Sequence, residues 1–101
     1  MKMMFLLPAL VAGTISFNIV ASDDVNHAEI RDMVKKGEIL SLESILAQFP
    51  EKEYGKLLDL EIEREHGAIV YELEFLRVDG VVIEIEVDAR NGVILKQEIE
   101  D

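Results

Sequence analysis

The side chains best suited to chemistry in this sequence are carboxylates, and many of them alternate with apolar residues. The chain carries 21 Asp and Glu against 10 Lys and Arg. From Lys56 onward an acid stands at every second position of several short segments, as in Leu60-Glu61-Ile62. Carboxylates hold cations, meet basic protein surfaces, or act in pairs as general acid and base. Which of these uses applies depends on how the helices and strands place the carboxylates relative to one another.

Other reactive groups are few. The two histidines, His27 and His66, stand far apart in the sequence and away from any carboxylate at metal-ligand spacing, and there is no Cys. The segment Asp88 to Gly92 lacks the alternating oxygen ligands and the late Glu of a calcium loop, so it indicates a hairpin turn. No glycine-rich phosphate loop follows a strand pattern. We therefore expect no catalytic residue, no metal site and no cofactor.

The first 21 residues predict export. Lys2 gives a positive start, an apolar stretch follows, and Ala21 precedes the polar Ser22-Asp23-Asp24. This order is typical of a secretory signal peptide over residues 1–21, with an uncleaved membrane anchor as the alternative. We expect a periplasmic or secreted domain over residues 22–101. Removal of Lys2 changes the net charge from −11 to −12, which disfavours nucleic acid and anionic lipid as partners.

Two short helices are predicted after the signal segment. Ile30, Met33 and Val34 have helical spacing and Gly37 follows as a terminator, which predicts a helix over about 25–36. Ser41 is placed to cap a second helix over about 41–49, whose apolar stripe ends at Phe49 before Pro50. Residues 51–55 are expected to form a loop.

The pattern then changes to a period of two, which indicates β-strands. Strands are expected over about 57–65, 68–77, 81–88 and 93–99, separated by turns at His66-Gly67, at 78–80 and at 88–92. The predicted fold class is α+β, with one or two short N-terminal helices packed on one face of a three- to four-stranded antiparallel meander sheet. The stripe of the second helix would cover the apolar face.

Strand register follows from keeping apolar residues on one face. A two-residue turn at His66-Gly67 and a three-residue loop at 78–80 satisfy this requirement, and a loop over 88–92 continues it. The predicted apolar pairs are Ile62 with Tyr71, Leu60 with Leu73, Leu58 with Phe75, Phe75 with Ile83, Leu73 with Ile85, Tyr71 with Val87, Val87 with Val93 and Ile85 with Leu95.

The same register predicts a row of opposed acids on the other face. Like charges directly opposite each other destabilise a sheet. Such a row therefore indicates a solvent-exposed face that meets a basic partner or binds cations. Charged strand faces also prevent aggregation, which is the alternative without a specific role. The candidate partner-binding residues are Glu61, Glu72, Glu74, Glu84 and Glu86.

The segment from Leu58 to Ile99 resembles the PepSY domain. The segments that carry the resemblance are Leu60-Glu61-Ile62-Glu63, His66-Gly67, Val70-Tyr71-Glu72-Leu73-Glu74, Asp79-Gly80, Glu84-Ile85-Glu86-Val87-Asp88-Ala89, Asn91-Gly92 and Val93-Ile94-Leu95. The helix predicted over 41–49 fits the family's lead helix. The resemblance implies a helix packed on an antiparallel sheet, an association with protease inhibition and regulation of extracytoplasmic activity, and no catalytic residue.

Together these observations predict a non-catalytic binding module that modulates a protein partner, such as a protease or a membrane sensor. After signal cleavage no membrane contact is expected. The alternative is an acidic protein that binds or buffers cations through the same five glutamates. An acid/base enzyme is disfavoured because a flat strand face offers no pocket.

Overall fold

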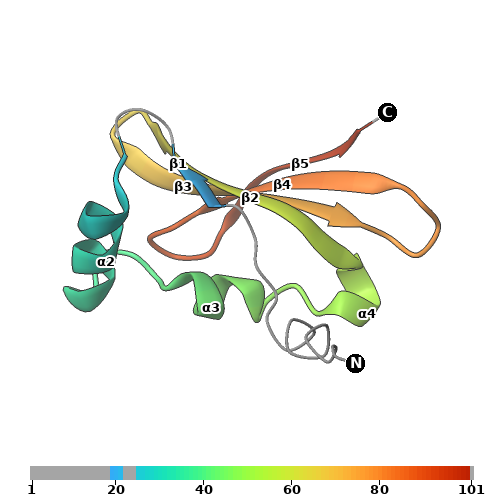
Figure 1. Ribbon diagram of the computed structural model, residues 1–101, viewed down its shortest axis with the longest axis horizontal. Coiled ribbons are helices and arrows are strands. Elements are labelled where there is room, and N and C mark those ends of the chain that lie inside the picture. Colours follow the sequence, from blue (N-terminus) through green and yellow to red (C-terminus); the bar gives the residue numbers. More distant parts are fainter. Residues whose placement is uncertain (1–18, 22–24, 101) are drawn as a thin grey trace, which may run out of the picture.

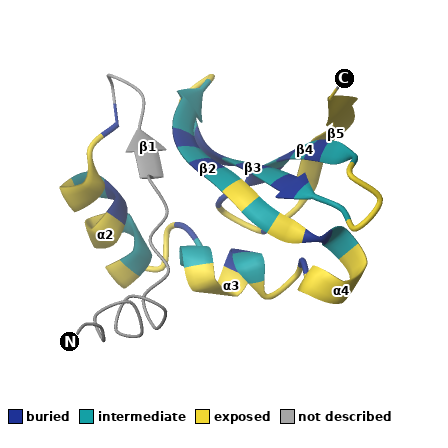
Figure 2. Cartoon of the chain, turned by 45° about the vertical axis from the view of Figure 1, so that its right-hand side comes forward, coloured by how far each residue is buried: buried dark blue, intermediate teal, exposed yellow. Residues whose placement is uncertain are grey.

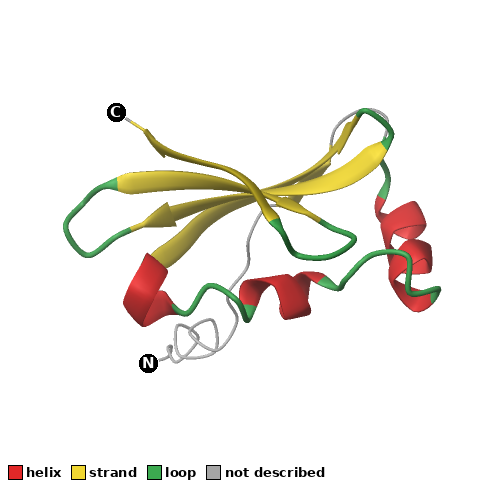
Figure 3. Cartoon of the chain, turned by 180° about the vertical axis from the view of Figure 1, so that it is seen from behind, coloured by secondary structure: helices red, strands yellow, loops and turns green. Residues whose placement is uncertain are grey.

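The computed structural model describes residues 19–21 and 25–100. In this part of the chain five strands form one sheet in the order β1-β2-β3-β4-β5, and three short helices lie along one side of it (Figures 1 and 3). The last four strands form an antiparallel meander of β2 (Lys56–Glu65), β3 (Ala68–Leu76), β4 (Val82–Asp88) and β5 (Ile94–Glu100). The predicted α+β architecture is confirmed.

The helix α2 (His27–Lys35) lies within the predicted range of about 25–36 and starts two residues later. The Asn26 side-chain oxygen accepts a hydrogen bond from the Glu29 amide at 2.8 Å, which caps the first turn. At the other end Gly37 has a φ of 75°, and the amide of Glu38 donates to the Met33 carbonyl at 2.9 Å. This is a Schellman termination, and a glycine suits it because the conformation is left-handed.

The second predicted helix is shorter in the structure than in the prediction. The helix α3 (Leu42–Leu46) starts where Ser41 accepts a hydrogen bond from the Ser44 amide at 3.1 Å. After Leu46 the chain tightens into a turn, in which the Phe49 amide donates to the Leu46 carbonyl at 3.0 Å. Phe49 is still buried, at 5% exposure, so the predicted apolar stripe covers the sheet as expected.

The loop expected over residues 51–55 is wrong, because Glu51–Tyr54 form a short helix, α4. Its start is favoured by two acids in the first turn, and the Pro50 carbonyl accepts from the Tyr54 amide at 2.9 Å. The Tyr54 ring packs against Phe49 with centroids 4.9 Å apart. Gly55 then turns the chain into β2; a Cβ there would lie 2.1 Å from the Leu76 carbonyl oxygen.

The first two hairpins have the predicted registers. His66 and Gly67 have φ values of 51° and 81°, as a two-residue type I′ turn requires. Across the second hairpin the Arg77 amide donates to the Val81 carbonyl at 2.9 Å, which closes the predicted three-residue loop. The pairs of Leu60 with Leu73, Ile62 with Tyr71, Phe75 with Ile83, Leu73 with Ile85 and Tyr71 with Val87 are confirmed.

Two predicted registers are wrong, the first because of a bulge and the second because of a shorter loop followed by a bulge. In β2 an irregularity between Leu57 and Asp59 pairs Leu57, not Leu58, with Phe75, and leaves Leu58 46% exposed. The last hairpin has a four-residue loop over 89–92, closed by a 2.9 Å bond from the Asp88 amide to the Val93 carbonyl. Val87 therefore pairs with Ile94, and a second irregularity pairs Ile85 with Gln97 instead of Leu95. A bulge adds a residue that an alternation pattern does not reveal.

The core lies between the helices and one face of the sheet, and Figure 2 shows the buried residues gathered there. Leu73, Ile85 and Ile45 are fully buried at its centre. Tyr71 is 1% exposed, and its hydroxyl donates to the Leu40 carbonyl at 3.0 Å. Tyr71 and Phe75 are thus both buried in the core, on the face where the predicted apolar pairs place them.

One strand was not predicted. Ile19–Ala21 form β1, which pairs in parallel with Leu60, Glu61 and Ile62 at the edge of β2. The remainder of the predicted signal peptide, residues 1–18, lies outside the described residues.

Candidate functional site

The five glutamates predicted to share one face do so in the structure. Glu61 lies opposite Glu72 in the β2–β3 pair. Across β3 and β4, Glu72 lies opposite Glu86 and Glu74 lies opposite Glu84. We call this set of Glu61, Glu72, Glu74, Glu84 and Glu86 the acidic ladder. It occupies the face of the sheet turned away from the core cluster, since its members alternate with buried residues along each strand.

The structure adds acids that the predicted site omitted. Glu63 lies two residues from Glu61 on the same strand face, and its carboxylate joins the ladder. Because Glu63 alternates with Ile62 in the sequence, the strand pattern could have placed it on this face. Glu98 pairs with Glu84 across β4 and β5, and the Glu100 carboxyl group raises the pKa of Glu74. These two were missed because the predicted register of the last strand was wrong.

Crowding on this face holds protons on carboxyl groups. Partial burial, a hydrogen bond with Glu84 and the nearby charges of Glu63, Glu84 and Glu61 raise the pKa of Glu72 to about 8. The pKa of Glu74 is raised chiefly by its hydrogen bond with Glu100, and burial is the largest cause of the raised pKa of Glu86. Near neutral pH, Glu72 is therefore protonated in most folded molecules.

Three carboxylates of this face come close enough to share a cation. One oxygen each from Glu61, Glu63 and Glu72 lie within 4.8 Å of one another. Calcium prefers six to eight oxygen ligands, so these three would leave several positions to water. The arrangement can attract a cation or a basic side chain, and it supplies no nucleophile with an adjacent base.

The other residues singled out in the sequence have structural places. His27 is the first residue of α2, and His66 lies in the type I′ turn. In the last hairpin, Asp88 is buried at 7% exposure and accepts hydrogen bonds from the Arg90 amide and from Arg90 Nη2, each at 2.9 Å. These bonds lower the pKa of Asp88. Arg90 thus engages the carboxylate that a calcium loop would need, and the turn interpretation agrees with this geometry.

Among the described residues, no helix has the length and apolar character needed to cross a membrane.

A comparison with protein families matches the region that holds the acidic ladder. A family model described as the peptidase propeptide and YPEB domain, PepSY, matches residues 39–98. The uncharacterized protein YkoJ of Bacillus subtilis (strain 168) is 36% identical over 47 residues, which is 46% of this chain and 28% of that protein. The chain therefore matches less than a third of that relative's length. No solved structure matches.

Proposed function

Because the chain belongs to the PepSY family of peptidase propeptide and YPEB domains, we propose that it is an exported, non-catalytic module that binds and modulates a protein partner. The first candidate partner is a protease and the second is the sensor region of a membrane protein. The domain's family is of the kind associated with protease inhibition and regulation. The predicted signal peptide supports action in the periplasm or outside the cell.

The observation that carries this proposal is the acidic ladder. Opposed carboxylates lower the free energy of unfolding, yet they line three neighbouring strands while the helices cover the other face. A basic partner surface would relieve that repulsion on binding, because each of its Lys or Arg side chains would lie between two acids. Charge complementarity of this kind also speeds association.

Capture of partners from the cell envelope tests the proposal. The exported protein is immobilised and compared with Glu72→Gln/Glu84→Gln/Glu86→Gln, which neutralises the centre of the ladder. The matched control is Glu43→Gln/Glu51→Gln/Glu53→Gln, which makes the same number of Glu→Gln changes at exposed helix positions. We expect a discrete partner that the ladder variant loses and the helix variant keeps. Equal retention by all three proteins would contradict a role for the ladder.

Protease modulation is tested on the captured partner. If that partner is a protease, its peptidase activity should change in proportion to added exported protein and saturate near one molar equivalent. The ladder variant should need a higher concentration for the same change. A captured protease whose activity is indifferent to the protein would remove the inhibitory version of the proposal.

A second candidate function is cation binding or buffering, favoured by the convergence of Glu61, Glu63 and Glu72. Thermal melting in millimolar calcium, against sodium at matched ionic strength, separates it from the first, because plain screening also weakens exposed repulsion. We expect screening alone to account for any rise in Tm. A saturable, calcium-specific rise that Glu72→Gln abolishes would favour cation binding over a protein partner.

Export is tested by the intact mass of the protein recovered from the periplasm. The signal argument predicts a chain beginning at Ser22. A mass that retains residues 1–21 would reverse the proposed cleavage.

A further inference from the structure

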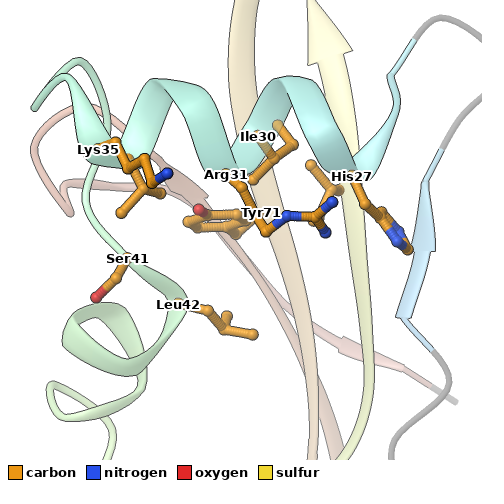
Figure 4. A pocket seen from close by; sticks show the side chains of 9 residues that line it. His27, Ile30, Arg31, Lys35, Ser41, Leu42 and Tyr71 are labelled. Carbon is orange, nitrogen blue, oxygen red and sulfur yellow. The ribbon is translucent and has the colours of Figure 1, made fainter.

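A groove on the helix side of the sheet lies apart from the acidic ladder. It has a volume of about 460 Å³ and runs between α2 and the start of α3. Its apolar lining includes Ile62 and Tyr71 of the sheet together with Ile30 and Leu42. Figure 4 shows Tyr71 between Ile30 of α2 and Leu42 at the start of α3. An apolar groove of this size accommodates a few side chains of an extended segment.

The rim of this groove is basic, although the chain as a whole carries a net charge of −11. His27, Arg31 and Lys35 all line it, and their spacing of four residues places them on one side of α2. All three are exposed. Within residues 25–100 the ion pairs of α2 involve its other residues, namely Lys36 with Asp32 and Glu29 with Arg64. The groove therefore presents the cationic side chains of Arg31 and Lys35 without carboxylate partners from the described chain.

The groove adjoins a sheet edge that already accepts a strand. Ile62 belongs both to the groove lining and to the three residues of β2 that pair with β1. In Figure 4, β1 runs beside β2, and His27 lies at the β1 end of α2. Cleavage after Ala21 would remove β1 and leave the backbone groups of this edge unpaired.

We propose that this edge and groove bind an extended segment of the partner protein, added parallel to β2 in the position of β1. The inference rests on the proposed function and adds where the partner binds and what its segment must contain. Residues opposite Leu60 and Ile62 share their face of the sheet, so apolar side chains there point toward the groove. The residue between them lies opposite Glu61, where Lys or Arg is favoured.

The basic rim defines the end of the segment. A strand parallel to β2 runs in the direction of β1, toward the start of α2 (Figure 4). Acidic residues that follow its apolar pair therefore approach His27 and Arg31. The recognised segment has the order apolar, basic, apolar, then acidic. In the chain's own sequence the Ile-Val-Ala of β1 is followed by Ser-Asp-Asp, and this sequence shares the apolar and acidic parts of that order.

The test is an NMR titration of the exported, ¹⁵N-labelled protein with the peptide Thr-Ile-Lys-Val-Ser-Asp-Asp. Intact mass first establishes that residues 1–21 are absent; their retention would overturn the proposal, because β1 would keep the edge. We expect saturable shifts at the amides of Leu60, Glu61 and Ile62 and along α2. The full chain, with β1 in place, should bind at least about tenfold more weakly, which corresponds to roughly 1.4 kcal/mol.

Matched variants identify the two parts of the contact. Arg31→Gln/Lys35→Gln should weaken binding about five- to tenfold, whereas Lys36→Gln, at the C-cap of the same helix but paired with Asp32, should leave it unchanged. A peptide with Asn in place of both Asp residues should lose the same factor. A peptide N-methylated at the residues that would bond β2 should lose measurable binding, because strand addition needs those amides.

The outcomes separate this inference from the proposed function. Binding that is saturable, maps to Leu60–Ile62 and depends on the Asp residues supports the groove. Absence of shifts there, or equal binding of the N-methylated peptide, overturns it. If the capture experiment yields a partner whose retention is unaffected by Arg31→Gln/Lys35→Gln and by excess peptide, the groove assignment fails while the binding-module function stands. If no partner is captured, the function itself fails.

Discussion

The two faces of this sheet are built from alternate residues of the same strands, yet they contribute to stability with opposite sign. On the helix side, Leu73 and Ile85 pair directly and are fully buried. One residue along each strand, Glu72 and Glu86 pair with equal regularity and are only partly covered. The first face lowers the free energy of the folded state by burying apolar area, and the second raises it by opposing like charges. Stability resides on one face, which leaves the other available for interaction.

The largest expected effect comes from breaking the helix-side face. Leu73→Ala should lower the free energy of unfolding by about 2–5 kcal/mol, because it leaves a cavity at the centre of a small core. Urea denaturation followed by circular dichroism measures this change. Glu72→Ala, one residue away, is the matched control and should cost little or be stabilising. Equal destabilisation by the two variants would show that the face assignment is wrong.

A smaller effect of opposite sign is expected from the open face. The pKa of Glu72 is raised to about 8 in the folded protein, so the folded state binds more protons than the unfolded state from about pH 4.5 to 8. Its contribution to stability is present at low pH and is lost as the pH rises through that range. Glu72→Gln should remove this loss and stabilise the protein by roughly 1–3 kcal/mol at pH 8.

Parallel denaturation curves at pH 5 and pH 8 measure the effect. The difference in free energy of unfolding between the two pH values should be smaller in Glu72→Gln than in the wild type. Glu43→Gln, on an exposed helix position, is the control and should leave the difference unchanged. An identical pH dependence in wild type and Glu72→Gln would argue against crowding of the ladder.

Tyr71 joins the helix layer to the sheet, and removing its hydroxyl should have a moderate effect. Tyr71→Phe keeps the ring but leaves the Leu40 carbonyl without its 3.0 Å donor. The expected loss is about 0.5–1.5 kcal/mol, typical of one hydrogen bond. Thermal melting compares the stability lost with this hydrogen bond with the stability lost in Phe75→Leu, which alters packing alone. A Tyr71→Phe protein as stable as the wild type would mean that water replaces the lost donor.

The smallest effect is expected at the edge of the open face. Lys96 lies opposite Glu86, and its ammonium is 3.5 Å from the Glu98 carboxylate. Both groups are about half exposed, so Lys96→Gln should lower stability only slightly, and less at high salt. Melting at 20 mM and 500 mM sodium chloride measures this difference. A loss that salt leaves unchanged would mean that Lys96 contributes by packing.

Most of the fold could be predicted because local signals agreed with one another. The cap at Ser41, the terminator at Gly37 and the turn at His66-Gly67 each fix a boundary, and the apolar alternation then fixes the registers of β2, β3 and β4. The predicted registers failed where one extra residue enters a strand, because the bulges near Leu58 and Leu95 leave no mark in an alternation pattern. The partners of β5 were also misplaced because the last loop is one residue shorter than expected.

The residues of the candidate site could be predicted only where the strand registers were predicted correctly. The five predicted glutamates needed only the correct registers of three strands, and the structure brings them together. Glu98 and Glu100 depended on β5 and were missed. The groove beside α2 could not be foreseen, because its lining comes from segments whose distance in space no local pattern gives. Its basic rim was readable as His27, Arg31 and Lys35 at helical spacing, without any indication of what they surround.

The most direct test of the division between the two faces is the titration of the Glu72 carboxyl carbon by ¹³C NMR. The crowded ladder predicts a midpoint near pH 8, with the resonance of Glu43 as an exposed reference in the same sample. Glu84→Gln should lower the Glu72 midpoint, because it removes one of the charges that raise it. A Glu72 midpoint close to the ordinary value for glutamate, about 4.3, would contradict the account, since the opposed acids would then not be coupled.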